Sequence, residues 1–172
     1  MSTRCNIILQ VKKEDLGKTI KFDATKLPTP LEDWTAYGNE VGENICQEVT
    51  LEKPFIGIYC HSDGYPDGVG KVLLDKYADY DTILNLIAGG FCSFVWFDGV
   101  RHYANRIGEN WSDIKPIQSD KPVTICGWTE YAYVFKNNKW YFSEVRFDKY
   151  DNDKIGRLKL LNEKSINDYL NN

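Results

Sequence analysis

The sequence predicts a single α+β domain, in which a mainly antiparallel sheet built from hairpins carries a central pair of helices on one face. Three observations lead to this fold class. Strand-like segments follow one another across short turns, helical periodicity is confined to the middle of the chain, and no linker or repeat divides the 172 residues. A chain of this length buries roughly 70 % of its unfolded surface, enough for one self-sufficient core. We therefore expect residues 1–172 to form one domain.

Two strands and a long loop are expected in the first part of the chain. The segment Arg4–Val11 is rich in Ile and Val and alternates loosely, as a strand does. The stretch GKTIKFDA, residues 17–24, predicts a second strand that closes a hairpin with the first. Between about 27 and 44, Pro and Gly interrupt polar residues. This pattern predicts a long surface loop, which holds Trp34 and Tyr37.

The middle of the chain predicts a central strand and two short helices. FIGIYC, residues 55–60, is apolar on both faces of the expected strand, which favours a strand inside the sheet. Apolar residues recur at helical spacing from Val69 to Tyr77. Asp79 or Asp81 then caps a second helix, which ends at the glycines 89–90. A crossover that carries both helices back to the sheet as a βαβ unit fits this plan.

The last third of the chain is rich in strands. Asp98-Gly99 lies between apolar segments and is the signal for a type I′ hairpin turn. Asn137-Asn138 repeats this arrangement between two aromatic strands. GRLKLL, residues 156–161, predicts a last strand, and residues 163–172 predict a short helix or a frayed tail.

Composition narrows the classes of partner. Lys and Arg number 21 against 25 Asp and Glu, giving a net charge of -4, and no basic cluster is present to follow a phosphate backbone. This argues against duplex nucleic acid as a partner. No apolar run reaches the roughly 20 residues that span a bilayer. The first ten residues also lack a secretory signal, so we expect a cytoplasmic protein without a membrane partner.

The cysteines argue against both a disulfide framework and a zinc knuckle. They are odd in number, widely spread and without a Cys-x-x-Cys pair. We expect most of them to be buried thiols, since free Cys behaves as a small hydrophobe. No compact ligand spacing suggests a metal site, and no cofactor is expected. The five are Cys5, Cys46, Cys60, Cys92 and Cys126.

The stretch IYCHSDGYPDGVGK, residues 58–71, joins the predicted central strand to the first helix. His61 and Asp63 share one face if the strand continues, whereas Cys60 points away and cannot act as a nucleophile beside His61. An imidazole oriented by a carboxylate suits ligand binding or acid–base work. The alternative is structural, because Asp63-Gly64 is itself a favoured turn whose side chains satisfy loop amides.

The second half of this stretch suggests an anion site. Gly64, Gly68 and Gly70 let backbone amides approach a ligand, and Lys71 stands where the following helix presents its unpaired N–H groups. The spacing is one residue longer than in a Walker loop and the Ser or Thr is missing, so triphosphate hydrolysis is not implied. A tight turn from strand to helix explains the glycines equally well. Tyr65 is the aromatic residue expected to contact a ligand.

Other aromatic residues are candidates for stacking or for the core. Trp34, Tyr37, Trp96, Trp111 and Trp128 are available to stack a base or grip a peptide. Most aromatic residues in strands are core residues, however. We expect Trp96 and Trp140 to lie inside.

The motif YCHSDGYPDGVGKVLLDKY, together with the opening STR and the later EYAYVFKNNKWYFSE, resembles a family of small uncharacterised proteins encoded by phages, prophages and bacteria. Many relatives carry Trp where this chain has Ser62. The resemblance implies a mobile-element setting and brings no established activity. Accessory proteins of this origin frequently interfere with host defence, by sequestering a nucleotide signal or by occupying a host protein.

Three hypotheses of function remain. The first is a module that binds a small anionic, nucleotide-like ligand, with counter-defence sequestration as its role. The second is a protein–protein inhibitor of a host factor, and the third is a hydrolase or transferase that uses His61 with Asp63. The predicted ligand-binding residues are His61, Asp63, Tyr65, Gly68, Gly70 and Lys71.

Overall fold

The computed structural model describes residues 3–28, 46–105, 109–125, 128–146 and 154–172. Its strands are β1 (Cys5–Gln10), β2 (Thr19–Lys21), β3 (Glu48–Thr50), β4 (Phe55–Cys60), β5 (Cys92–Trp96), β6 (Gly99–His102), β7 (Ile117–Ser119), β8 (Tyr131–Lys136), β9 (Lys139–Arg146), β10 (Lys154–Ile155) and β11 (Lys159–Leu160). Its helices are α1 (Lys71–Lys76), α2 (Tyr80–Ala88), α3 (Trp111–Ile114) and α4 (Glu163–Leu170), with short turns of 3-10 helix at Lys13–Asp15, Ala24–Lys26 and Tyr103–Asn105.

The described strands form one nine-stranded sheet and one separate pair. The main order is β10-β9-β8-β1-β4-β5-β6, with β7 paired to β4, β11 paired to β9, and β2 with β3 apart. Most neighbours are antiparallel, and the exceptions are β1 with β8 and β4 with β5. The predicted α+β class with a mainly antiparallel sheet is therefore confirmed. FIGIYC is β4, which lies inside the sheet between β1 and β5 as expected.

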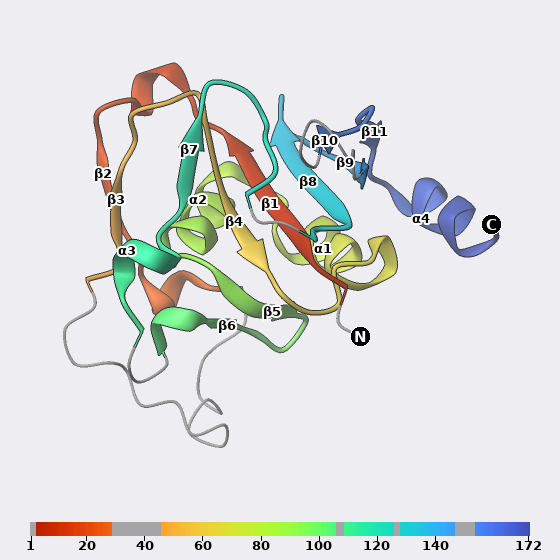
Figure 1. The fold of residues 1–172 in the computed structure, drawn as a ribbon, viewed down its shortest axis with the longest axis horizontal. Helices are drawn as coiled ribbons and strands as arrows, with labels where there is room; N and C mark the ends of the chain where they lie inside the picture. Colours follow the sequence, from red (N-terminus) through yellow and green to blue (C-terminus); the bar gives the residue numbers. More distant parts are fainter. Residues whose placement is uncertain (1–2, 29–45, 106–108, 126–127, 147–153) are drawn as a thin grey trace.

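The two predicted helices follow β4 and return the chain to β5. Because β4 and β5 are parallel, this is the expected βαβ crossover. Figure 1 shows α1 and α2 together on one side of the sheet. Asp79 caps α2 by accepting a hydrogen bond from the Thr82 amide at 2.9 Å, and the helix ends at Gly89. Its Ile83, Leu86 and other apolar side chains are buried in the core.

Of the two predicted hairpin turns, one is confirmed and one is displaced by a residue. Asn137 and Asn138 have φ values of 52° and 60°, as a type I′ turn between β8 and β9 requires. In the β5–β6 hairpin, Trp96 pairs with Gly99. The turn residues are therefore Phe97 and Asp98, and the prediction of Asp98-Gly99 is wrong by one position.

The predicted hairpin between the first two strands is wrong. β1 pairs with β4 and β8, and β2 pairs with β3 in the separate sheet. The physical reason is burial. Ile7 and Ile8 point to opposite faces of β1 and are both buried, so this strand needs long neighbours on each side. A three-residue β2 does not provide such a neighbour.

Several remaining predictions are settled by the described residues. GRLKLL contains β11, and the predicted helix or tail at 163–172 contains α4. Cys5, Cys60 and Cys92 are buried free thiols, Cys46 is exposed, and Cys126 lies outside the described residues. The predicted loop from residue 29 onwards, with Trp34 and Tyr37, also lies outside them.

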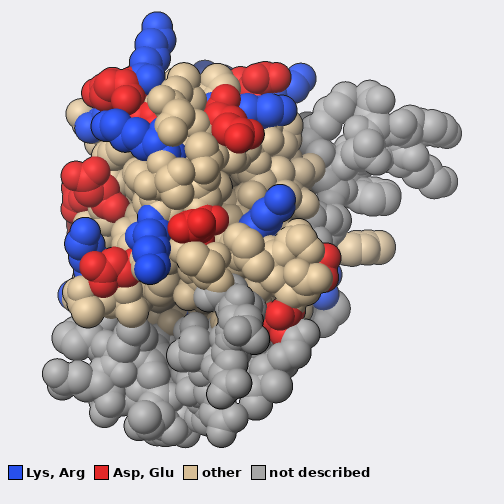
Figure 2. Space-filling model, turned by 90° about the vertical axis from the view of Figure 1, so that its left-hand side faces the viewer, with Lys and Arg blue, Asp and Glu red and all other residues tan. Residues whose placement is uncertain are grey.

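One face of the protein mixes both signs of charge. Figure 2 shows Lys and Arg interspersed with Asp and Glu over the described part of the face that carries β2 and β3. Such mixing does not provide the continuous basic track that a phosphate backbone requires. Within the described segments, no helix has the length and apolar character needed to cross a bilayer.

Candidate functional site

The stretch between β4 and α1 forms a tightly bonded corner. Asp63 has a φ of 58°, so the extended conformation of the strand ends there and the predicted Asp63-Gly64 turn is present. The Gly64 amide donates to the Thr3 carbonyl at 2.9 Å, and the Tyr133 hydroxyl donates to the Gly64 carbonyl at 2.7 Å. A Cβ atom on Gly64 would lie 2.9 Å from the Cβ of Cys5. The corner is thus fixed to β1 and β8.

Three backbone donors in the second half of the corner are already used within it. The amides of Gly68 and Gly70 donate to the Tyr65 carbonyl at 2.9 and 3.2 Å, and the Val69 amide donates to the Asp63 carbonyl at 2.8 Å. A Cβ atom on Gly68 would collide with the Asp63 carbonyl oxygen. Close packing therefore accounts for this glycine, and satisfied amides offer nothing to an anion. The predicted phosphate contact of Gly68 and Gly70 stays a prediction that this geometry does not favour.

His61 and Asp63 do not form the expected pair. His61 Nδ1 lies 2.7 Å from the Tyr59 hydroxyl, whereas Asp63 Oδ2 accepts a 2.8 Å hydrogen bond from the Trp96 indole. The left-handed backbone at Asp63 breaks the alternation on which the pairing depended. The carboxylate is therefore not placed to orient the imidazole for acid–base chemistry.

The other predicted residues divide between two hollows. Asp63, Tyr65 and Gly68 line a hollow of about 670 Å³ beside the corner. Lys71 lines a different hollow of about 240 Å³, where Glu163 also lies. The structure thus separates the predicted lysine from the predicted aromatic contact.

The two tryptophans expected in the core have different environments. Trp140 is only 3 % exposed, which confirms the prediction for that residue. Trp96 is 37 % exposed, so its prediction is wrong. The reason is its place at the end of β5, beside the hairpin turn, where one ring edge is reached by the Asp63 carboxylate.

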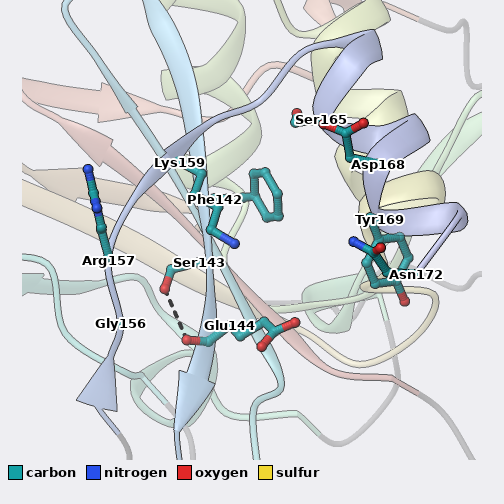
Figure 3. Close-up of a pocket in the computed structure, with 10 residues that line it drawn as sticks. All are labelled: Phe142, Ser143, Glu144, Gly156, Arg157, Lys159, Ser165, Asp168, Tyr169 and Asn172. Atoms are coloured by element: carbon teal, nitrogen blue, oxygen red, sulfur yellow. Dashed lines mark hydrogen bonds between the residues drawn. The ribbon is translucent and has the colours of Figure 1, made fainter.

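A third hollow, of about 430 Å³, contains none of the predicted residues. Figure 3 shows Glu144 and Lys159 on its strand side and Tyr169 on its α4 side. Arg157 and Asp168 also line it. Its walls therefore carry two residues of each sign, and their charges favour neither an anion nor a cation.

One aligned row of residues fixes which side chains face the helices. Cys5 lies opposite Cys60, Cys60 opposite Cys92, and Cys92 opposite His102, so the row crosses β1, β4, β5 and β6. His102 Nε2 donates to the Leu86 carbonyl of α2 at 2.9 Å, which places the row on the α2 side. Because strand residues alternate, the next residue along each strand faces away from α2.

On that second face lies a group that we call the polar cluster: Arg4, Asn6, His61 and Arg101. Arg4 directly precedes Cys5, and His61 directly follows Cys60, its partner in the register. Arg101 directly precedes His102. Asn6 is 0 % exposed and pairs across the sheet with Tyr59, whose hydroxyl contacts His61. Arg4 extends the β1–β4 register beside His61, whereas Arg101 lies on β6, with β5 between it and β4.

The polar cluster holds every buried side-chain nitrogen or oxygen that lacks a hydrogen-bond partner in the described segments. These atoms are Arg4 Nε, Arg101 Nε, and both the Oδ1 and the Nδ2 of Asn6. A buried polar group without a partner costs about 1–3 kcal/mol, so native proteins rarely keep one without a role. Unpartnered atoms on three residues of one sheet face make the polar cluster the candidate site.

Sequence reasoning found His61 but missed the rest of the polar cluster. Arg4, Asn6 and Arg101 lie far from His61 along the chain, and only the register of the strands brings the four onto one face of the sheet. A polar Asn inside the first apolar strand was the one available signal.

Comparison of the chain with models of protein families, with curated proteins and with solved structures gave no match. The site must therefore be interpreted from its own geometry. Within the described ranges, no group of three His, Cys, Asp or Glu side chains is placed to hold a metal ion.

Proposed function

We propose that this protein is a binding module for a small anionic, nucleotide-like ligand, and that the polar cluster holds it. The observation that supports this proposal is the set of unpartnered buried polar atoms in the polar cluster. A guanidinium group matches phosphate or carboxylate with paired N–H donors. The Asn6 amide has a donor and an acceptor to satisfy, and the edge of a nucleobase offers both.

The anion site predicted from the sequence lay at the start of α1. The proposed site lies on the sheet face that points away from α2. It keeps His61. It replaces the other predicted residues, Asp63, Tyr65, Gly68, Gly70 and Lys71, by Arg4, Asn6 and Arg101. The mobile-element setting rests on the motif alone. In that setting the role we propose is sequestration of a nucleotide signal in the bacterial cytoplasm.

Titration calorimetry and thermal shift test this proposal directly. The panel contains inorganic phosphate, pyrophosphate, and cyclic and ADP-ribose-type nucleotides. We expect at least one nucleotide to bind and to raise the melting temperature. Arg101→Gln and Arg4→Gln should each weaken binding about tenfold or more, since hydrogen bonds to charged groups contribute about 1.5–3 kcal/mol.

Two matched variants locate the site. Lys71→Gln removes the same charge at the helix start, and Arg157→Gln removes it in the hollow of Figure 3. Both should bind as the unmodified protein does. Loss of binding in Lys71→Gln with normal binding in Arg101→Gln would return the site to the helix start. No response to any member of the panel would reject the proposed function.

A further inference from the structure

The corner and the tip of the β5–β6 hairpin together border the open hollow of about 670 Å³, which we call the aromatic hollow. Its wall carries Trp96, Tyr65 and Phe97, which are 37 %, 38 % and 44 % exposed. Val72 of α1 completes the apolar part. Exposed aromatic side chains gathered in one hollow are typical of the residues that dominate binding energy at protein interfaces.

The Trp96 ring is held in place before any partner arrives. Its indole nitrogen donates to Asp63 Oδ2 at 2.8 Å, and its ring stacks on Phe94 with centroids 3.8 Å apart and planes inclined by 16°. A side chain fixed in this way loses little conformational entropy on binding. One flat aromatic surface is therefore presented in a defined orientation.

The charged residues of the aromatic hollow have a single sign. Asp63, Asp67 and Asp98 line it, and its described lining includes no Lys, Arg or His. Asp63 is engaged by Trp96, whereas Asp67 and Asp98 have no hydrogen bond or ion pair in the part of the chain that the structure describes. Carboxylates beside aromatic rings attract a cation, which gains both ion pairing and cation–π energy.

We propose that the aromatic hollow docks an arginine-bearing segment of a partner protein. The guanidinium group stacks on Trp96 and donates its N–H groups to Asp67 and Asp98, while Tyr65 and Phe97 contact the residues beside the arginine. Arginine suits this place better than lysine because its planar group stacks on a ring and donates in a fork. A hollow of about 670 Å³ also accommodates more than one guanidinium group.

This inference shares no residue with the polar cluster, so the two proposals succeed or fail separately. The probe is a short capped peptide of alternating Gly and Arg, and its twin carries uncharged citrulline in place of Arg. Binding is followed by the NMR signal of the Trp96 indole N–H, which is identified by its disappearance in Trp96→Phe. We expect the arginine peptide to shift this signal, the citrulline peptide not to shift it, and added salt to weaken binding.

The carboxylates are tested by a double substitution with a matched control. Asp67→Asn with Asp98→Asn should weaken the arginine peptide about fivefold or more, the equivalent of roughly 1 kcal/mol. Asp75→Asn with Asp81→Asn removes the same charge from exposed positions outside the hollow and should bind normally. The proposal fails if both doubles lose affinity equally, if the citrulline peptide binds as well, or if the Trp96 signal does not move. Equal affinity for free arginine would overturn the protein segment as the occupant.

Discussion

The hydroxyl of Tyr133 in β8 donates a 2.7 Å hydrogen bond to the carbonyl oxygen of Gly64, which lies 69 residues earlier in the chain. Both residues are buried. The same ring would lie 3.0 Å from a Cβ atom on Gly70. The Tyr133 side chain of β8 therefore contacts both ends of the corner. The corner begins directly after His61, and its residues Asp63, Tyr65 and Gly68 line the aromatic hollow.

Tyr133→Phe should destabilise the fold by about 1–3 kcal/mol, because it leaves the buried Gly64 carbonyl without its donor. Urea unfolding measures this loss as a lower midpoint at unchanged slope. Tyr141→Phe is the control, since Tyr141 is half-buried and its hydroxyl has no hydrogen bond in the described segments. An equal loss in both variants would show that the Tyr133 hydroxyl does not hold the corner.

Gly68→Ala should destabilise the corner by about 2 kcal/mol or more, because the new methyl group meets the Asp63 carbonyl oxygen, which is backbone and cannot turn aside. Gly17→Ala provides a contrast. Gly17 has a φ of +91° but nothing within 4 Å of the added atom, so only backbone strain opposes that substitution. Thermal unfolding should rank Gly68→Ala as the more damaging change. The reverse order would mean that the corner relaxes freely.

His102 should make the fold less stable in mild acid. Burial lowers the pKa of His102 to about 4 and outweighs the hydrogen bond to Leu86, whereas the unfolded chain has a His pKa of about 6.5. As the pH falls from about 6.5 to about 4, the His102 imidazole becomes protonated in the unfolded chain but stays neutral in the folded protein. The contribution of His102 to the free energy of unfolding is therefore fully present above about pH 6.5. It decreases by about 3 kcal/mol as the pH falls to about 4.

The measurement is urea unfolding at several pH values, repeated with His102→Gln. The variant lacks the titrating group and should show a shallower decrease of stability over the same pH window, even if it is less stable at neutral pH. The contact between His102 and Phe22, with ring centroids 4.8 Å apart, would be perturbed equally at every pH. Parallel pH profiles for the two proteins would show that His102 is not the group responsible.

How far the sequence predicts this fold depends on whether the signal is local. The Asn137-Asn138 turn and α2 with its Asp79 cap are encoded within a few residues, and both were predicted correctly. The partners of β1 are not local, since they come from residues 55–60 and 131–136. A sequence that is apolar on both faces indicates an interior strand but does not name its neighbours. The nearest strand-like segment was therefore chosen wrongly.

The candidate site was predictable in part for the same reason. His61 and the Asp63-Gly64 turn were found because the motif itself is distinctive. The polar cluster arises from the register of four strands, which brings Arg4, Asn6 and Arg101 from distant segments onto the sheet face that carries His61. The left-handed φ of Asp63, which turns its carboxylate to Trp96, also depends on contacts that the motif does not contain.

Asn6→Leu separates a ligand-binding role of the polar cluster from a structural one. Leu has nearly the shape of Asn, and the Asn6 amide is fully buried without a partner. The substitution should therefore raise the free energy of unfolding by about 1–3 kcal/mol, measured in urea. The same variant should lose the nucleotide response. A gain in stability that removes binding is the trade-off expected at a functional site.

Asn85→Leu is the matched control for this last prediction. Asn85 is 7 % exposed, but its amide is satisfied: it accepts from the Asp23 amide at 2.8 Å and donates to the Asp23 carbonyl at 2.9 Å. Its replacement should destabilise the fold, because both Asp23 groups lose their partner. If Asn6→Leu lowers stability as Asn85→Leu does, the Asn6 amide is satisfied in solution by bound water. Its unpaired atoms would then no longer indicate a ligand.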